Sequence, residues 1–224
     1  MKRACVFDWD GTLRPGITAL DWIEFLQPTL PNAEAAAKAM HALIANYRSG
    51  KASYGHLVSE AAELYAHCVS QANVTVVTDA AMQFVERDCR YLFEFTEPVL
   101  RTAKQRGYEI FLVSGTPAEV LEAYSSVLAI DHVLGMTVQR LQGRFTGLVA
   151  ENFGLAEKKR EATNHIRDQG FLIELAAGNS TNDLPLLEHA RHQFLISNEK
   201  DVAQVVKATI IDTEHALKRM LEAL

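Results

Sequence analysis

A short apolar run near the start of the chain ends in two acidic residues. The run ACVF at positions 4–7 precedes Asp8 and Asp10, and Gly11 with Thr12 begins a turn. Two carboxylates two residues apart on a strand project to the same side. A buried strand with this ending delivers the pair to the carboxyl edge of a parallel sheet, where open α/β folds bind ligands. Because two close anions are costly, the pair also predicts a nearby cation or a shared proton.

The string DWDGT is short, so it also fits a simpler interpretation. An Asp in this position can close a strand through an Asx turn without any catalytic role. Motifs farther along the chain distinguish a catalytic pair of carboxylates from a simple Asx turn.

Composition narrows the class of protein. The 224 residues are 48% hydrophobic and 22% charged, which is typical of a soluble globular chain of one domain or one domain with an insertion. A formal net charge of −6 gives no electrostatic footprint for nucleic acid or an anionic membrane. No apolar run approaches the roughly 20 residues needed to span a bilayer, and the chain begins directly with a charged residue and a strand. The three cysteines are widely spaced, so we expect reduced thiols in a cytoplasmic protein without nucleic-acid or membrane partners.

The pattern of apolar residues divides the chain into two kinds of structure. Residues 17–92 contain no convincing strand, but apolar residues recur at helical spacing in four segments. The expected helical segments are residues 20–26, 33–47, 53–65 and 79–93. Strands and helices alternate from Thr96 onward, which predicts a parallel sheet covered on both faces. We therefore expect a doubly wound, Rossmann-like α/β core formed by residues 1–15 and 93–224, split by a helical cap over residues 16–92.

The remaining strands of the sheet are expected after Thr96. The expected strands are residues 109–115, 172–178, 193–197 and 208–212, with extended pieces over 133–150 around the turn at Gln142–Gly143.

A second candidate motif is LVSGTP at residues 112–117. Ser114 ends a predicted strand, and Gly115 and Thr116 are expected to lead into a helix. A hydroxyl and free backbone N–H groups at a helix start can bind an anion. A plain Ser/Thr helix cap explains the same residues.

A third candidate is the basic pair Lys158–Lys159 at the start of a predicted helix. A lysine beside a phosphate offsets developing negative charge, whereas a solvated surface pair has no such role. Helical spacing places Lys159 on the same stripe as Ala162 and Ile166, so Lys159 is expected to point inward and Lys158 outward.

The fourth motif is AAGNSTNDLPLLEHA at residues 176–190. Asn179 and Asp183 flank a tight turn between a predicted strand and helix. Their oxygens are hard donors of the kind that Mg²⁺ prefers, although the two side chains could instead only stabilise the turn. All four motifs lie at carboxyl ends of strands or at adjoining helix starts, and this coincidence favours the catalytic interpretation.

Together the motifs resemble those of haloacid dehalogenase-type phosphatases over residues 4–198. The insertion between the first two motifs is similar to the branch with a helical cap. The segments YRSGKASYGHLV (residues 47–58) and MTVQRLQGRFTGLVAENFGLAEKKREA (residues 136–162) resemble the phosphoserine phosphatase-like subfamily.

The resemblance implies a role for each motif residue. Asp8 is the expected nucleophile that forms an aspartyl-phosphate. Asp10 is expected to protonate the leaving alcohol and then to activate water. The residues expected at the phosphoryl group are Gly11, Thr12, Ser114, Gly115 and Lys159. Mg²⁺ is the expected cofactor, with Asp8, Asp10, Asn179 and Asp183 as its ligands.

Two positions depart from the family pattern. Asn179 stands where the family usually has Asp, which predicts weaker Mg²⁺ binding with a larger share for Asp183. Ile17 stands where phosphoserine phosphatases have a Glu that meets the substrate's amino group, so phosphoserine is a doubtful substrate. Arg14 and Arg48 could each meet a second anionic group, or be ordinary surface residues.

These considerations favour a Mg²⁺-dependent phosphatase acting on a small phosphate monoester. A phosphotransferase or mutase of the same chemistry is one alternative. A phosphate-binding protein with a weakened metal site is another, supported by Asn179 alone. The sequence gives neither the substrate nor the oligomeric state.

Overall fold

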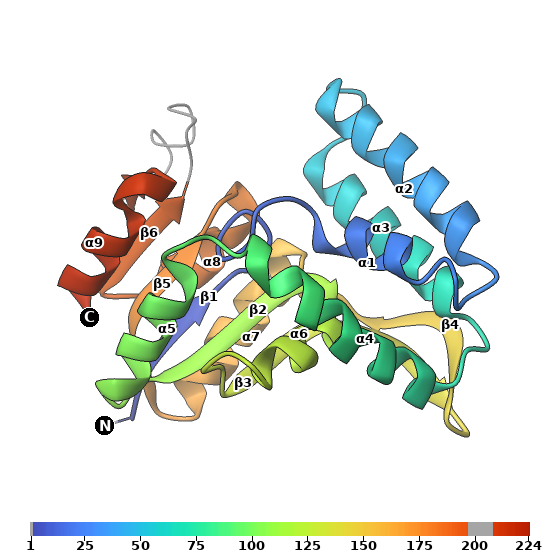
Figure 1. Cartoon of the computed structure of the whole chain (residues 1–224). Helices are drawn as coiled ribbons and strands as arrows, with labels where there is room; N and C mark the ends of the chain where they lie inside the picture. Colours follow the sequence, from blue (N-terminus) through green and yellow to red (C-terminus); the bar gives the residue numbers. More distant parts are fainter. Residues whose placement is uncertain (1, 197–207) are drawn as a thin grey trace.

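A seven-stranded sheet forms the centre of the molecule (Figure 1), in a computed structural model that describes residues 2–196 and 208–224. The strand order is β4-β3-β2-β1-β5-β6-β7, parallel throughout except for the antiparallel pair of β3 with β4. The strands are β1 (Lys2–Phe7), β2 (Glu109–Pro117), β3 (His132–Leu141), β4 (Arg144–Glu151), β5 (Phe171–Gly178), β6 (His192–Ile196) and β7 (Thr209–Ile211). The sequence-based expectation of a mainly parallel α/β sheet is confirmed, and the predicted strand end at Ser197 lies outside the described residues.

Helices cover both faces of this sheet. The helices from residue 96 onward are α5 (Thr96–Gln105), α6 (Ala118–Ser125), α7 (Ala156–Asp168), α8 (Leu184–Leu187) and α9 (Thr213–Ala223). Side chains of β1 alternate between two hydrophobic clusters: Cys5 and Phe7 join residues of α5, α6 and α9, whereas Ala4 and Val6 join residues of α7 and α8. This alternation is the period of two expected of a strand, and it explains why the buried part of this central strand, residues 4–7, is apolar on both faces.

The segment between β1 and α5 is helical. It contains α1 (Thr18–Phe25), α2 (Ala33–Arg48), α3 (Tyr54–Val69), α4 (Val74–Asp88) and a 3₁₀ turn at Cys89–Tyr91. Figure 1 shows α2 and α3 beyond one end of the sheet, while α3 contacts β4 and α4 packs along α6 of the α/β part. One hydrophobic cluster contains residues of both the helical segment and the α/β part. The division of the chain into a core domain and a cap domain over residues 16–92 stays a prediction. No helix among the described residues has the length and apolarity to cross a membrane.

Helix α4 begins five residues before its predicted start. Asn73 caps it by accepting a hydrogen bond from the Thr75 N–H at 2.8 Å. The following β-branched run (Val-Thr-Val-Val) has low helix propensity, which hid this first turn from the sequence pattern. The helical spacing of Met82, Val85 and Cys89 predicts one buried stripe in this segment, but Met82 and Cys89 are exposed.

Candidate active site

Asp8 follows β1 directly and is held in place from three sides. Its backbone N–H donates to the Ala177 carbonyl of β5 at 3.0 Å, so the residue extends the sheet pairing by one position. The residue is 5% exposed, and its side chain accepts hydrogen bonds from Lys159 Nζ (2.8 Å) and Thr12 Oγ1 (3.1 Å). Burial, together with the nearby carboxylates of Asp183 and Asp10, raises the pKa of Asp8 to about 7, although Lys159 acts to lower it.

Asp10 lies between the helical segment and the sheet. Its Oδ1 accepts from the backbone N–H of Thr18 at 2.9 Å and from the Thr18 hydroxyl, at the first residue of α1. Its Oδ2 accepts from Thr116 Oγ1 of β2 at 2.9 Å. Burial raises the pKa of Asp10, and the bonds from Thr18 and Thr116 oppose that rise. Burial therefore favours the protonated form that a general acid requires.

Ser114 lies in β2 beside these carboxylates and is 2% exposed. Its Oγ accepts from the Thr116 N–H at 3.3 Å. The strand was expected to end at Ser114, with Gly115 and Thr116 leading into a helix, but β2 continues to Pro117 and α6 begins at Ala118. The amide of Gly115 thus belongs to the end of a strand instead of to a helix N-terminus.

Lys159 is the inward-facing member of the basic pair, as helical spacing predicts. It is 2% exposed, and its ammonium binds Asp8 and Asp183. Although burial acts to lower the pKa of Lys159, these two carboxylates raise it well above its usual value. Lys158 instead pairs with Glu151 (3.0 Å) and Glu161 (2.8 Å) at the surface. Lys159 therefore stays charged and lies beside Asp8, the expected nucleophile.

The side chain of Asp183 stabilises the turn in which it lies. Its Oδ1 binds Lys159, and its Oδ2 accepts from the backbone N–H groups of Asn179 (2.9 Å) and Ser180 (2.8 Å) and from Ser180 Oγ (2.8 Å). It is 1% exposed and does not line the cavity described below. The expected larger share of Asp183 in metal binding does not fit this arrangement, which makes it a support for Lys159 and the turn.

The Asn179 amide faces the Asp10 backbone carbonyl. One amide atom lies 3.2 Å from that oxygen and 3.3 Å from Asp183 Oδ2. A nitrogen placed there donates to both acceptors, whereas an oxygen placed there makes a cluster that only a cation can satisfy. Separations of this size are close to the roughly 3 Å between neighbouring ligands of an octahedral Mg²⁺. Gly11 permits the approach, because a Cβ on it would meet the Asn179 side chain at 2.0 Å.

With its amide oxygen turned toward the Asp10 carbonyl, Asn179 completes a donor set that fits Mg²⁺ but carries little charge. This set consists of the Asp8 carboxylate, the Asp10 carbonyl and the Asn179 amide oxygen, since Asp183 Oδ2 already accepts three hydrogen bonds. Within residues 2–196 and 208–224, no group of three or more His, Cys, Asp or Glu side chains is placed to hold a metal ion.

A cavity of about 510 Å³ opens over these residues. The α/β part contributes residues from all four motifs, and the helical segment forms the facing wall. The residues of this wall are Gly16, Ile17, Ala19, Tyr47, Arg48, Tyr54, Leu57, Val58 and Ala61. Thr12 is fully buried outside the lining and acts on the Asp8 side chain, which corrects its expected place at the phosphate.

The two candidate arginines have different places. Arg14 is 3% exposed and donates to both oxygens of Asp88 (2.6 and 2.7 Å) and to Asp21 (2.5 Å), so it does not reach the cavity. Its expected role at a substrate anion is therefore corrected. Arg48 is exposed at the cavity wall, and it has no ion-pair partner among the described residues.

Three site residues were not assigned from the sequence. Thr116 and Thr18 hold Asp10, and Tyr54 reaches the cavity from the first residue of α3. Burial raises the pKa of Tyr54 above its usual value, and the nearby carboxylates of Asp8 and Asp183 add to this rise. Thr116 lies inside the second motif, so its position was a usable signal. Thr18 and Tyr54 belong to the helical segment, and the sequence pattern does not show how this segment packs against the sheet.

Comparisons with known proteins agree with this geometry. The family model described as haloacid dehalogenase-like hydrolase matches residues 5–188. No curated protein sequence matches the chain. A crystal structure of a protein with unknown function from Bordetella pertussis Tohama I is similar at 21% identity and a TM-score of 0.78, over 95% of this chain and 99% of that one.

Two structures of phosphoserine phosphatases are also similar. One is a phospho-aspartyl intermediate analogue, at 20% identity and a TM-score of 0.65, covering 97% of this chain and 98% of that one. The other is a substrate-bound complex, at 18% identity and a TM-score of 0.69, covering 98% of each chain. At these identities the structures establish a shared fold.

Proposed function

Since the chain belongs to the haloacid dehalogenase-like hydrolase family, we propose that it is a Mg²⁺-dependent phosphatase that hydrolyses a small phosphate monoester through an aspartyl-phosphate. The observation that carries the proposal is the contact of Lys159 Nζ with Asp8 Oδ1 at 2.8 Å, at the base of a cavity that also contains Asp10 and Ser114. A buried carboxylate beside a fixed ammonium can attack phosphorus while the developing charge is offset.

In the first step, a carboxylate oxygen of Asp8 attacks phosphorus and the bond to the alcohol oxygen breaks. Asp10 gives its proton to that oxygen, so the alcohol leaves neutral. The hydroxyl of Ser114, the amide of Gly115 and the ammonium of Lys159 border the cavity and supply donors for the phosphoryl oxygens.

In the second step, water attacks the phosphorus of the aspartyl-phosphate. Asp10, now ionised, takes a proton from this water, and the bond to Asp8 breaks to release phosphate. Thr18 and Thr116 hold the Asp10 carboxylate toward the cavity in both steps.

Bound Mg²⁺ would supply positive charge between the nucleophile and the phosphate oxygens. The residues that would hold it are Asp8, Asp10 through its carbonyl, and Asn179. The single formal charge of this set supports weak binding, which is a further part of the proposal.

The cavity wall supports a substrate unlike phosphoserine. Ile17 is apolar and cannot pair with an ammonium, whereas Arg48 is a cation with no acidic partner in the described part of the chain. The alcohol is therefore proposed to carry an anionic group and no positive charge near Ile17.

Hydrolysis of p-nitrophenyl phosphate with and without Mg²⁺ tests the proposal. The wild type is expected to be active with Mg²⁺, and Asp8→Asn to lose at least about a thousandfold in kcat. Asp79→Asn is the matched control, because Asp79 is exposed on α4. Wild-type activity retained by Asp8→Asn would refute the mechanism.

A further inference from the structure

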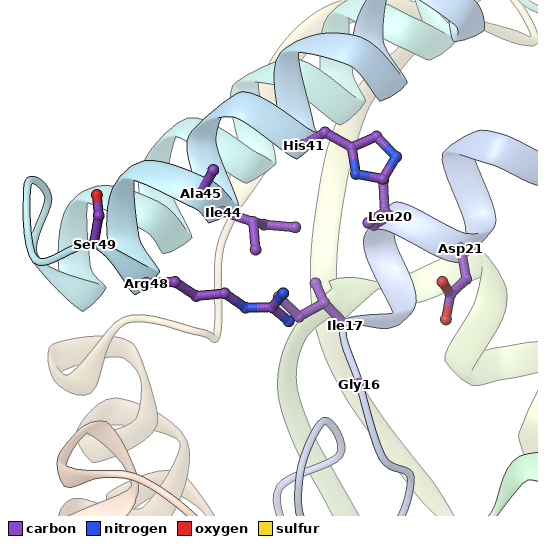
Figure 2. Close-up of a pocket in the computed structure, with 9 residues that line it drawn as sticks. All are labelled: Gly16, Ile17, Leu20, Asp21, His41, Ile44, Ala45, Arg48 and Ser49. Atoms are coloured by element: carbon purple, nitrogen blue, oxygen red, sulfur yellow. The ribbon is translucent and has the colours of Figure 1, made fainter.

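A second cavity, of about 690 Å³, lies between α1 and α2 (Figure 2). It shares Gly16, Ile17 and Arg48 with the catalytic cavity, so the two spaces meet at these residues. Figure 2 shows the Arg48 side chain extending from α2 toward Ile17 at this junction. A substrate long enough to pass Ile17 would therefore extend from the catalytic cavity into this groove.

The groove beyond the junction is mainly apolar. Leu20 of α1 and Ile44 and Ala45 of α2 line it, together with Ser49 at the end of α2. Its two other polar residues already have partners: Asp21 binds Arg14 at 2.5 Å, and His41 lies 2.7 Å from Glu24. Among the described residues that line the groove, Arg48 is the one charged side chain without an ion-pair partner.

The order of these features matches one chemical class. A phosphate at Asp8 would be followed by an anionic group at Arg48, and then by an apolar portion over Leu20, Ile44 and Ala45. We propose that the groove between α1 and α2 is a substrate subsite, and that the alcohol of the substrate carries a carboxylate followed by an uncharged apolar extension. The inference rests on the proposed phosphatase function and adds the substrate class to it.

A ladder of synthetic esters tests the subsite. O-phosphoserine with an N-acetyl, N-butanoyl or N-hexanoyl group keeps the phosphate and carboxylate constant, removes the ammonium charge, and lengthens the apolar part by two methylenes at each step. Each methylene that enters the groove is expected to raise kcat/KM roughly threefold, or about tenfold per step. Equal kcat/KM across the three esters would overturn the inference without any variant.

Two variants of α2 localise the effect. Ala45→Phe fills the groove, so the ratio of kcat/KM for the hexanoyl to the acetyl ester is expected to fall toward one. Ala35→Phe is the matched control on the same helix, because Ala35 is exposed and lines neither cavity. Its ratio is expected to equal that of the wild type. A wild-type ratio in Ala45→Phe would overturn the placement in this groove.

Failure of the proposed function gives a different result. In that case the wild type hydrolyses neither p-nitrophenyl phosphate nor any of the esters. Calorimetric titration with the same acetyl and hexanoyl esters then decides the subsite: tighter binding of the hexanoyl ester supports it, and equal affinity overturns it.

Discussion

At the scale of residues, the metal ligands and the pKa of Asp10 each depend on a single polar side-chain group. Asn179 brings an amide to the Asp10 carbonyl where the resemblance leads us to expect a carboxylate. The hydroxyl of Thr116 binds the Asp10 carboxylate and opposes the effect of burial on its pKa. Each side chain can be altered with little change in volume, so its electrostatic contribution can be measured separately.

Asn179→Asp is expected to tighten Mg²⁺ binding on the order of tenfold, because it adds one formal negative charge to the ligand set. The measurement is the Mg²⁺ dependence of p-nitrophenyl phosphate hydrolysis, together with direct calorimetric titration of Mg²⁺. An unchanged Mg²⁺ affinity would show that Asn179 is not a ligand.

Thr116→Val is expected to move the alkaline limb of the kcat/KM profile to higher pH. The hydrogen bond from Thr116 stabilises ionised Asp10, so its removal raises the pKa of Asp10 and keeps the acid form to higher pH. Thr116→Ser, which keeps the hydroxyl, is the control with an unshifted profile. A limb that stays in place in Thr116→Val would remove Asp10 from the assignment of the general acid.

At the scale of elements, two glycines set the distance between β2 and the segment that leads into α7. A Cβ on Gly115 would lie 3.0 Å from Gly154 Cα, and a Cβ on Gly154 would lie 2.9 Å from Gly115 Cα. Asn182 also fixes this segment by donating to the Gly154 carbonyl at 3.2 Å. The close backbone approach brings the start of α7, and with it Lys159, to the end of β2.

Gly154→Ala is expected to lower kcat/KM by about 10- to 100-fold, because it displaces the segment that positions Lys159. Its free energy of unfolding is expected to fall by about 1–3 kcal/mol through overpacking. Steady-state kinetics and urea unfolding measure the two effects. Gly55→Ala is the control, since a Cβ on Gly55 would meet no atom within 4 Å. Full activity in Gly154→Ala would contradict the positioning role.

The elements also show where prediction from sequence reaches its limit. The strands were predictable because β1, β2 and β5 are apolar runs of strand length bounded by turn residues. The end of β2 was not, because Gly115 and Thr116 resemble a helix start and are kept extended by pairing with β3 near Pro117. The start of α4 was hidden by β-branched residues that tertiary packing accommodates.

At the scale of the whole molecule, a buried ionic cluster joins the helical segment to the α/β part. Arg14 lies in the connection from β1 to α1, and Asp88 ends α4, before the chain returns to the sheet. Arg14 binds Asp88 and Asp21, and the Tyr124 hydroxyl of α6 also donates to Asp88. The two chain connections between the helical segment and the α/β part are thus held together by this cluster. A sequence pattern cannot give this, because Arg14 and Asp88 are 74 positions apart.

Arg14→Ala is expected to lower the free energy of unfolding by about 3–5 kcal/mol, because it leaves Asp88 buried without a counter-charge. Urea unfolding at neutral pH measures the change. Arg101→Ala is the control, since its pair with Glu97 is exposed and is expected to contribute less than about 1 kcal/mol. Equal effects of the two substitutions would contradict the role of the buried cluster.

The central claim is that Asp8 becomes phosphorylated during turnover. Trapping the phosphorylated enzyme after reaction with a ³²P-labelled substrate tests this claim most directly. Enzyme mixed with the ³²P-labelled N-hexanoyl ester or labelled p-nitrophenyl phosphate is quenched in acid, treated with protease and mapped by mass spectrometry. The account predicts a hydroxylamine-labile phosphoryl group on the peptide containing Asp8, absent from Asp8→Asn. Turnover by the wild type with the label on another residue, or continued turnover by Asp8→Asn, would contradict it.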